Sequence, residues 1–372
     1  MINNKEENPI SEFSLIAGPC SAESYEQLEQ TARFLTKFNV SISTSDYGAS
    51  LSESRRPIKI AAMRAGVWKP RTRPDSFEGH GLKALEWIGR IKENYTLPII
   101  TEVANAEHVE QCLKCHLDML WIGARTTGSP FAVQEIANAL KGTNIPVWIK
   151  NPLSPDLGLW LGAMERLQKA GVQKVGAIHR GFGLYNSVPY RNSPLWELPI
   201  ELKRLCPEIP ILCDPSHIAG ECRYVPELSQ AAIDLEMNGL MIEIHPKPQI
   251  ALSDASQQLD FDGFESMVSD FIFRDPFSAS SRLEQYRTVL DEIDEELLSV
   301  LSHRMELIRQ MGCLKKDENL SVLQLQRWKQ VLNRCMDLAK QKDLDPQFIK
   351  EVFSCVHAES VRIQNEIFGK SK

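Results

Sequence analysis

The residues best suited to chemistry stand at the ends of short apolar segments. Cys20 ends the first such segment, Asp214 and His217 follow the seventh, Glu243 ends the eighth, and Asp254 lies in the next loop. A thiolate, an imidazole and carboxylates together suit one divalent transition metal, because a thiolate ligand disfavours Mg²⁺. Taken singly, Cys20 could be a small buried residue and Glu243 a solvated strand end. Such residues from neighbouring segments favour a metal site.

Positively charged side chains stand at the ends of the other segments. Arginine can hold a carboxylate or phosphate through two parallel hydrogen bonds, and lysine adds a compact point charge. Unrelated surface cations are the alternative interpretation. A metal beside a cationic rim indicates a substrate with several phosphate or carboxylate groups and an oxygen that the metal can polarise. The cations are Arg64, Lys69, Arg71, Arg125, Lys150 and Arg180.

A scaffold must bring these ends together, and the pattern of apolar segments predicts one. Near-continuous apolar segments are typical of strands covered on both faces, and their alternation with helical stretches predicts an α/β fold, a (β/α)8 TIM barrel. An open doubly wound sheet is the alternative, but no GxGxxG follows the first segment. The carboxyl ends of barrel strands face the active site. The eight segments are SLIAGPC, IKIAAMRAG, LPIITEVA, MLWIGAR, PVWIKN, VGAIHRG, IPILCDPSH and GLMIEIHP.

The pattern changes after residue 265. From Arg282 the apolar residues fall three to four positions apart without strand signals, which predicts a long helix and two more over 322–342 and 346–368. We therefore expect a barrel domain over 1–265, a linker over 266–281 and a small all-α three-helix domain over 282–372. A long amphipathic helix in so small a domain needs a partner. A homodimer through this domain is expected, and a higher oligomer stays open.

Composition narrows the class of protein. Of the 372 residues, 43% are hydrophobic and 24% charged, which is typical of a soluble globular protein. No apolar run approaches the roughly 20 residues that cross a bilayer, and the N-terminus lacks the pattern of a secretory signal, so we expect a cytoplasmic protein. The net charge of −7 disfavours nucleic acid as a partner. Nine scattered cysteines predict reduced thiols, with a zinc or redox role for Cys112 and Cys115 as the minor alternative.

Seven motifs give the first part of the chain a specific resemblance. GPCSAES, WKPRTRP, WIGAR, WIKNP, HRGF, DPSH and MIEIHPKPQIALSDASQQL occur in order between about residues 14 and 262. They resemble the motifs of 3-deoxy-D-arabino-heptulosonate 7-phosphate (DAHP) synthases, in the branch related to 3-deoxy-D-manno-octulosonate 8-phosphate synthases. The resemblance implies that the metal is held by Cys20, His217, Glu243 and Asp254. It implies that phosphoenolpyruvate is surrounded by Arg64, Lys69, Arg125, Lys150 and Arg180.

The same resemblance implies the second substrate and the ion. Lys69, Pro70, Arg71 and Thr72 would contact erythrose 4-phosphate, whereas the octulosonate enzymes typically carry an Asn-Arg-Ser variant; arabinose 5-phosphate is therefore the alternative. Mn²⁺ is the expected ion, with Fe²⁺, Co²⁺ or Zn²⁺ as alternatives for this ligand set. The implied reaction joins C3 of phosphoenolpyruvate to the aldehyde carbon and releases phosphate. A Ser-rich stretch over 41–57 is interpreted as a surface insertion that could displace Arg64.

The helical part resembles the all-helical chorismate mutases, which are intertwined dimers that rearrange chorismate to prephenate. At about 100° per residue, Arg304 and Lys315 lie within roughly 20° of each other and can share a pocket. Arg287 lies about 100° away and should serve another pocket. The implied chorismate- and prephenate-binding residues are Arg287 of the partner subunit, Arg304, Lys315, Gln324, Arg327, Ser360 and Gln364.

One departure leaves the role of the helical part open. The family's Asp-x-x-Arg-Glu pattern reads Gln324, Arg327 and Trp328 here, so a carboxylate expected near the substrate hydroxyl is missing. Our main expectation is a bifunctional enzyme of aromatic amino-acid biosynthesis. In the alternatives, the helices sense chorismate or prephenate and give feedback control, or serve only as a dimer clamp.

Overall fold

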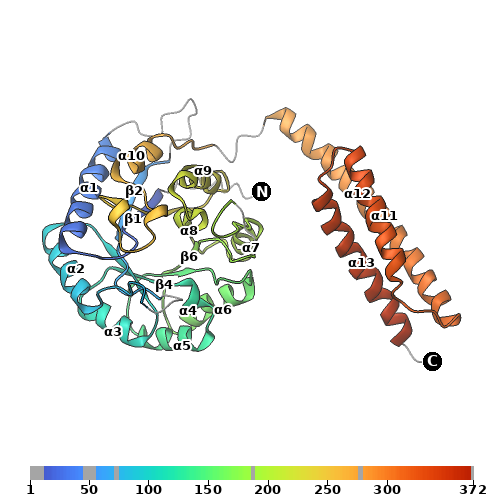
Figure 1. Ribbon diagram of the computed structural model, residues 1–372, viewed down its shortest axis with the longest axis horizontal. Helices are drawn as coiled ribbons and strands as arrows, with labels where there is room; N and C mark the ends of the chain where they lie inside the picture. Colours follow the sequence, from blue (N-terminus) through green and yellow to red (C-terminus); the bar gives the residue numbers. More distant parts are fainter. Residues whose placement is uncertain (1–11, 45–55, 71–74, 186–188, 275–279, 370–372) are drawn as a thin grey trace, which may run out of the picture. The chain divides into compact units, whose positions relative to one another are not determined.

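The chain folds into two compact units, Met1–Pro276 and Phe277–Lys372, each considered by itself. The computed structural model describes residues 12–44, 56–70, 75–185, 189–274 and 280–369. The first unit is a closed barrel of eight parallel strands that follow one another in chain order (Figure 1). None of the helices in the described ranges is long and apolar enough to cross a membrane.

Each predicted apolar segment forms one strand, which confirms the predicted barrel. The first and last strands pair in parallel and close it, with Gly18 beside Glu243. This closure places the carboxyl ends of the first and eighth strands side by side. The strands are β1 (Phe13–Gly18), β2 (Ile58–Arg64), β3 (Ile99–Val103), β4 (Met119–Ile122), β5 (Val147–Lys150), β6 (Val175–His179), β7 (Ile211–Cys213) and β8 (Gly239–Glu243).

Helices connect the strands and cover the outside of the barrel. Several begin at an acidic or amide side chain that accepts a backbone N–H three residues further on, as Asn105, Asp156 and Asp260 do. The longer ones are α1 (Tyr25–Thr44), α2 (Leu82–Asn94), α3 (Ala106–Lys114), α5 (Pro130–Ala139), α6 (Leu157–Lys169), α7 (Glu197–Leu205), α9 (Val225–Asp234) and α10 (Phe261–Ser269). Two short ones are α4 (Ala124–Thr127) and α8 (Pro215–Ala219).

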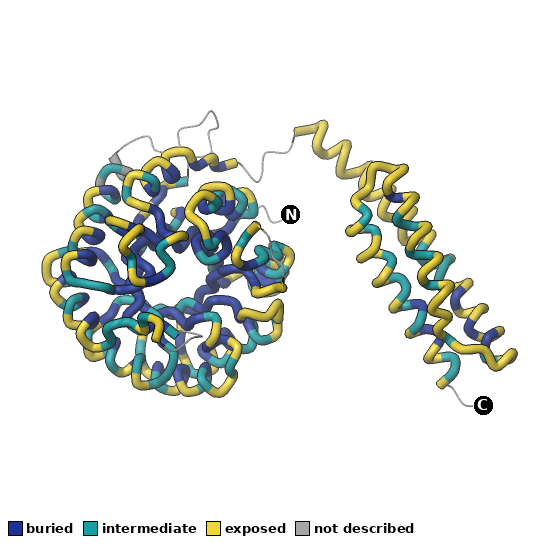
Figure 2. The backbone as a smooth tube through the Cα atoms, viewed as in Figure 1, coloured by how far each residue is buried: buried dark blue, intermediate teal, exposed yellow. Residues whose placement is uncertain are grey.

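The barrel has an inner and an outer core because strand side chains alternate between its two faces. On β4, Leu120 points to the outer core beneath the helices and Trp121 to the inner one. Burial follows this arrangement, with the strands dark blue and the outward faces of the helices yellow (Figure 2). The inner core is Ile16, Ala62, Ile100, Trp121, Ile178, Leu212 and Met241.

The barrel unit extends past the predicted boundary at residue 265. Helix α10 runs through that position, and the chain after it stays packed on the barrel. Phe271 and Phe273 are buried, with ring centroids 6.4 Å and 5.1 Å from that of Phe13 in edge-to-face contact. The first part of the predicted linker over 266–281 is therefore core structure.

Two further expectations fall on this unit. The predicted insertion over 41–57 begins inside α1, and its residues 45–55 lie outside the described ranges. Cys112 is buried on α3, and Cys115 is its half-buried C-cap. Neither belongs to a group of three or more potential metal ligands among the described residues.

The second unit consists of three helices, as predicted. They are α11 (Ser281–Asp317), α12 (Leu325–Gln341) and α13 (Pro346–Gly369). Ser280 caps α11 by accepting the backbone N–H of Leu283. A row of apolar side chains on α11 stays exposed in the single chain, including Leu290 at 57% and Ile293 at 51%. Such a row is typical of a protein–protein contact face.

Candidate functional site

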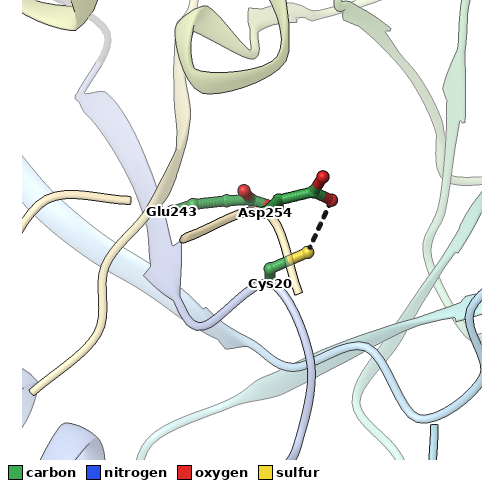
Figure 3. Close-up of side chains that lie close together, drawn as sticks. All are labelled: Cys20, Glu243 and Asp254. Atoms are coloured by element: carbon green, nitrogen blue, oxygen red, sulfur yellow. Dashed lines mark hydrogen bonds between the residues drawn. The ribbon is translucent and has the colours of Figure 1, made fainter. Parts of the chain in front are cut away.

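Three of the predicted metal ligands meet at the carboxyl ends of β1 and β8. The ligand atoms of Cys20, Glu243 and Asp254 all lie within 4.8 Å of one another. Cys20 Sγ is 3.2 Å from Asp254 Oδ2, and Figure 3 shows the side chains converging. Cys20 and Glu243 are fully buried. One sulfur and two carboxylates at this spacing can hold one divalent ion.

Glycine at position 18 allows this approach of the strands. Its φ is +150°, and a Cβ there would lie 2.1 Å from the carbonyl oxygen of Arg64. The close contact between the ends of β1 and β2 brings Cys20 over the barrel mouth. A side chain at position 18 would push the first ligand away from the others.

His217 is oriented toward this group by Asp214. Asp214 caps α8, so His217 lies one turn beyond the end of β7. The ring Nδ1 is 2.9 Å from Asp214 Oδ2, and Nε2 points toward Glu243, 3.7 Å from Oε1. His217 is not part of the three-residue group, but burial lowers the pKa of its imidazole and keeps it neutral. A neutral imidazole held at Nδ1 by a carboxylate is the form in which histidine binds metals.

The carboxylate ligands are themselves held by neighbouring side chains. Arg64 Nη2 donates to Glu243 Oε1 at 2.8 Å, and Gln257 Nε2 donates to Glu243 Oε2 at 2.7 Å. Arg191 Nη1 donates to Asp254 Oδ1 at 3.1 Å. These contacts fix the carboxylate rotamers before any ion binds, which favours metal affinity.

The protonation states also fit a metal. Burial, followed by the charge of Glu243, raises the pKa of the Cys20 thiol to about 12, so the thiol stays protonated and donates a hydrogen bond to Asp254 Oδ2. Burial alone would raise the pKa of Asp254, but the charge that His217 carries at acid pH and the charge of Arg191 bring it below its usual range. A bound cation would displace the thiol proton, because a coordinating thiolate is deprotonated. The donor set thus fits a first-row transition ion.

Four of the predicted cations are buried around the same mouth. They are Arg64 at 0% exposure, Lys69 at 8%, Lys150 at 4% and Arg180 at 6%. Arg125, on α4, is exposed and close enough for its charge to help lower the pKa of Arg180 to about 10, after burial as the larger cause. Buried charges are costly unless paired, so this cluster indicates a site built for anions.

The partners of these cations leave capacity for a ligand. Lys150 Nζ donates to Asp214 Oδ2 at 2.6 Å, and Lys69 Nζ donates to the carbonyl oxygen of Cys20 at 2.8 Å. Arg64 Nη1 is buried and makes no hydrogen bond among the described residues. Trp121 forms the floor, with the Arg64 and Lys150 charges 5.1 Å and 5.6 Å from its ring.

A cavity of about 370 Å³ adjoins this cluster at the ends of β2 and β3. Lys69 and Pro70 line this cavity, so the turn that was predicted to bind the sugar phosphate forms part of its wall. Arg71 and Thr72, the other two residues of that prediction, lie outside the described residues. The cavity is lined by Trp68, Lys69, Pro70, Glu78, Glu102, Ala104 and His108.

Sequence reasoning missed several residues of this site. Glu102 on β3 accepts from the indole N–H of Trp121 at 3.2 Å. Burial alone would lower the pKa of Arg64, and Glu102 adds to the larger charges of Glu243 and Asp214 that raise it. Because Glu102 lies near the end of a predicted strand, the sequence could have identified it as a site residue. Arg191, which holds Asp254, lies in a long loop with no such signal. It is found only through the fold.

A second polar cluster lies in the helical unit. Arg304 Nη1 on α11 donates to Ser360 Oγ on α13 at 2.7 Å, and Gln364 Nε2 donates to the carbonyl oxygen of Ser360. Lys315 Nζ donates to the carbonyl oxygen of Val322 at 2.7 Å. Lys315, Ser360 and Gln364 are buried. Cationic, hydroxyl and amide groups together can bind a ligand that carries two negative charges and also has uncharged polar groups.

Three predicted residues of this cluster are exposed in the single chain. Arg287 is exposed and pairs with Glu284, one turn away on α11. Gln324 and Arg327 are exposed at the start of α12. Trp328, beside them, stacks on His357, with ring centroids 4.0 Å apart and planes inclined by 7°. His357 was not predicted, although its spacing from Ser360 and Gln364 along one helix face was visible in the sequence.

Comparisons with known proteins identify a family for each of the two units. Residues 10–271 match the model of the DAHP synthetase I family, and residues 286–365 match that of chorismate mutase type II. The chain is 31% identical over 258 residues to phospho-2-dehydro-3-deoxyheptonate aldolase of Thermotoga maritima, covering 69% of this chain and 68% of that protein. It is 25% identical to 2-dehydro-3-deoxyphosphooctonate aldolase of Nitratidesulfovibrio vulgaris, covering 69% and 89%.

Solved structures agree with the sequence relatives. The crystal structure of the Thermotoga maritima DAHP synthase has a TM-score of 0.58 and 29% identity, covering 72% of this chain and 71% of that one. A truncated form of 3-deoxy-D-arabino-heptulosonate 7-phosphate synthase from the same organism has a TM-score of 0.56 and 28% identity, covering 70% and 85%.

Proposed function

The chain belongs to the DAHP synthetase I family and carries a chorismate mutase type II domain, and we propose that its barrel condenses phosphoenolpyruvate with erythrose 4-phosphate. The reaction forms a bond between C3 of phosphoenolpyruvate and the aldehyde carbon. Water then adds at C2 and inorganic phosphate leaves. The observation that carries the proposal is a group of metal ligands inside a ring of buried cations.

Cys20, His217, Glu243 and Asp254 are proposed to hold a divalent transition ion, Mn²⁺ in the first instance. When bound, the ion supplies Lewis acidity toward the aldehyde oxygen. Asp214 would hold the His217 ring with Nε2 turned toward such an ion, since its carboxylate accepts a hydrogen bond from Nδ1. Arg191, Arg64 and Gln257 hold the two carboxylates.

Arg64, Lys69, Arg125, Lys150 and Arg180 are proposed to surround phosphoenolpyruvate. Its carboxylate and phosphate would add hydrogen-bond acceptors to those that the protein already offers these cations. Arg64 Nη1 can take such an acceptor, because it is buried and makes no hydrogen bond among the described residues. Fixed cations in a site that excludes water stabilise charge that develops at the leaving phosphate.

Erythrose 4-phosphate is proposed to enter beside the KPRT turn, residues 69–72. Lys69 and Pro70 line the cavity of about 370 Å³, and Lys69 Nζ also donates to the carbonyl oxygen of Cys20. The alternative aldose is arabinose 5-phosphate, because octulosonate enzymes are also related to this chain.

Phosphate release tests the choice of substrate. Purified full-length protein is incubated with Mn²⁺, phosphoenolpyruvate and either erythrose 4-phosphate or arabinose 5-phosphate. We expect release with the four-carbon sugar, and loss of release in Lys150→Met. Release with the five-carbon sugar alone would reverse the assignment, and release with neither would reject the condensation.

For the helical domain we propose the rearrangement of chorismate to prephenate. This reaction needs no acid, base or nucleophile, only a cage that holds two carboxylates and stabilises charge on the ether oxygen. Arg304, Lys315, Ser360 and Gln364 supply such a cage. Gln324 and Arg327, with Arg287 of the partner subunit, are proposed to complete it in a homodimer.

The same pocket is proposed to regulate the barrel. A cationic pocket binds prephenate or chorismate whether or not it turns them over, and binding can shift a conformational equilibrium. Lys315→Ala separates the two roles in the full-length protein. If mutase turnover disappears while prephenate still inhibits DAHP formation, then catalysis and sensing use different contacts. If calorimetry detects no binding of either compound to the wild type, the helices serve only for dimerisation.

A further inference from the structure

His357 belongs to the row of side chains that forms the helical pocket. At about 100° per residue, positions 357, 360 and 364 fall within roughly 60° of one another on α13. Ser360 and Gln364 are 2% and 5% exposed, whereas His357 is half-buried. The row of buried polar groups therefore ends in an imidazole that a ligand can reach.

Charges from the neighbouring helix face this imidazole. Arg304 on α11 donates to Ser360, one turn away from His357. Burial first, and then the charges of Arg304 and Lys315, lower the pKa of His357. The imidazole is therefore neutral at pH 7. A neutral imidazole offers one N–H donor and one nitrogen acceptor.

Trp328 on α12 fixes the plane of the ring. The two rings stack nearly parallel, with centroids 4.0 Å apart. A stack covers one face of the imidazole and leaves its edge, with both nitrogens, free to hydrogen-bond. Neither nitrogen bonds a protein atom within the described part of the chain. The buried Oε1 of Gln364 has no partner there either.

This combination defines the ligand that fits. Arg304 and Lys315 are suited to bind the carboxylates of a ligand, because each carries a positive charge. A neutral imidazole binds a carboxylate less strongly than they do. An oriented, uncharged donor and acceptor suits an uncharged hydroxyl, which also donates and accepts. We propose that His357 determines specificity in the helical pocket by hydrogen-bonding the ring hydroxyl of a dianion held by Arg304 and Lys315. This inference rests on the proposed mutase and prephenate-binding role.

The test compares substrates with and without the hydroxyl in the full-length protein. His357→Phe keeps a ring to stack on Trp328 but removes both nitrogens. We expect kcat/KM for chorismate to fall 10- to 100-fold, because a site built to bind a hydroxyl discriminates strongly against its absence. For the 4-deoxy analogue of chorismate, we expect wild type and His357→Phe to be equal. His357→Asn, which keeps a donor and an acceptor, should recover part of the loss.

Two controls keep the test decisive. His303→Phe makes the same change at an exposed histidine on α11 and should have no effect. The far-UV circular dichroism of each variant reports on folding of the helices, and DAHP formation in the same samples reports on folding of the barrel. Equal activity of His357→Phe and wild type toward chorismate would overturn the inference, as would the same loss with the analogue. A wild type that neither turns over chorismate nor binds prephenate would reject the proposed function itself.

Discussion

Replacing Asp214 by Asn should separate the effect of charge from that of side-chain size at the proposed metal site. The carboxylate of Asp214 is fully buried and lies close to three side-chain nitrogens. They are Lys150 Nζ at 2.6 Å, His217 Nδ1 at 2.9 Å and Arg64 Nη1 at 3.8 Å. Asparagine keeps the size of the side chain and caps α8 equally well. It removes the negative charge that all three neighbours share.

The structure sets the size of the effect. Removing one partner of a buried ion pair costs about 3–5 kcal/mol. Burial already lowers the pKa of Lys150, so this lysine can lose its proton once the carboxylate is gone. We therefore expect a loss near the lower end, about 3 kcal/mol. Loss of the carboxylate that orients a metal-binding histidine typically lowers metal affinity about 10- to 100-fold.

Two measurements on the full-length protein check this. Titration calorimetry gives the Mn²⁺ affinity, and scanning calorimetry with a chelator gives the stability of the barrel transition. The matched control is Asp156→Asn, since Asp156 is an exposed cap of α6 that accepts the backbone N–H of Leu159. Wild-type Mn²⁺ affinity and wild-type stability in Asp214→Asn would refute the reasoning.

Other predictions follow from the same geometry. Cys20→Ala should abolish tight Mn²⁺ binding by calorimetry, whereas Cys222→Ala, at an exposed thiol, should not. His179 is fully buried, and its pKa is lowered from 6.5 to about 3, first by burial and then by the charge of Arg180. The unfolded chain therefore takes up a proton at a higher pH than the folded chain does, so the free energy of unfolding falls as the pH falls from 6.5 to 3. At about 1.4 kcal/mol per pKa unit, His179→Leu should remove roughly 5 kcal/mol of this acid-induced loss, measured by urea unfolding at several pH values; an unchanged pH dependence would contradict the assignment. Ile293→Asp on α11 should give monomers in sedimentation velocity, and an unchanged sedimentation coefficient would show that this face is not the dimer contact.

The sequence alone determined the architecture. Eight apolar segments with helical stretches between them were sufficient to predict a closed parallel barrel, because strands covered on both faces form short, nearly continuous apolar segments. The three helices after residue 280 followed from apolar residues at helical spacing. Polar residues at strand ends were also visible, since each follows an apolar run directly. The end of the barrel was not, because Phe271 and Phe273 form no periodic pattern.

The tertiary structure decided which polar groups act together. Closure of the barrel set Cys20 beside Glu243, although more than 200 positions separate them. The contacts of Arg191 with Asp254 and of Trp328 with His357 depend on how loops and helices pack, and no local spacing encodes them. Burial is likewise a property of the whole fold. It makes Cys20 a protonated thiol, keeps His217 and His357 neutral, and so sets the chemistry that each residue can perform.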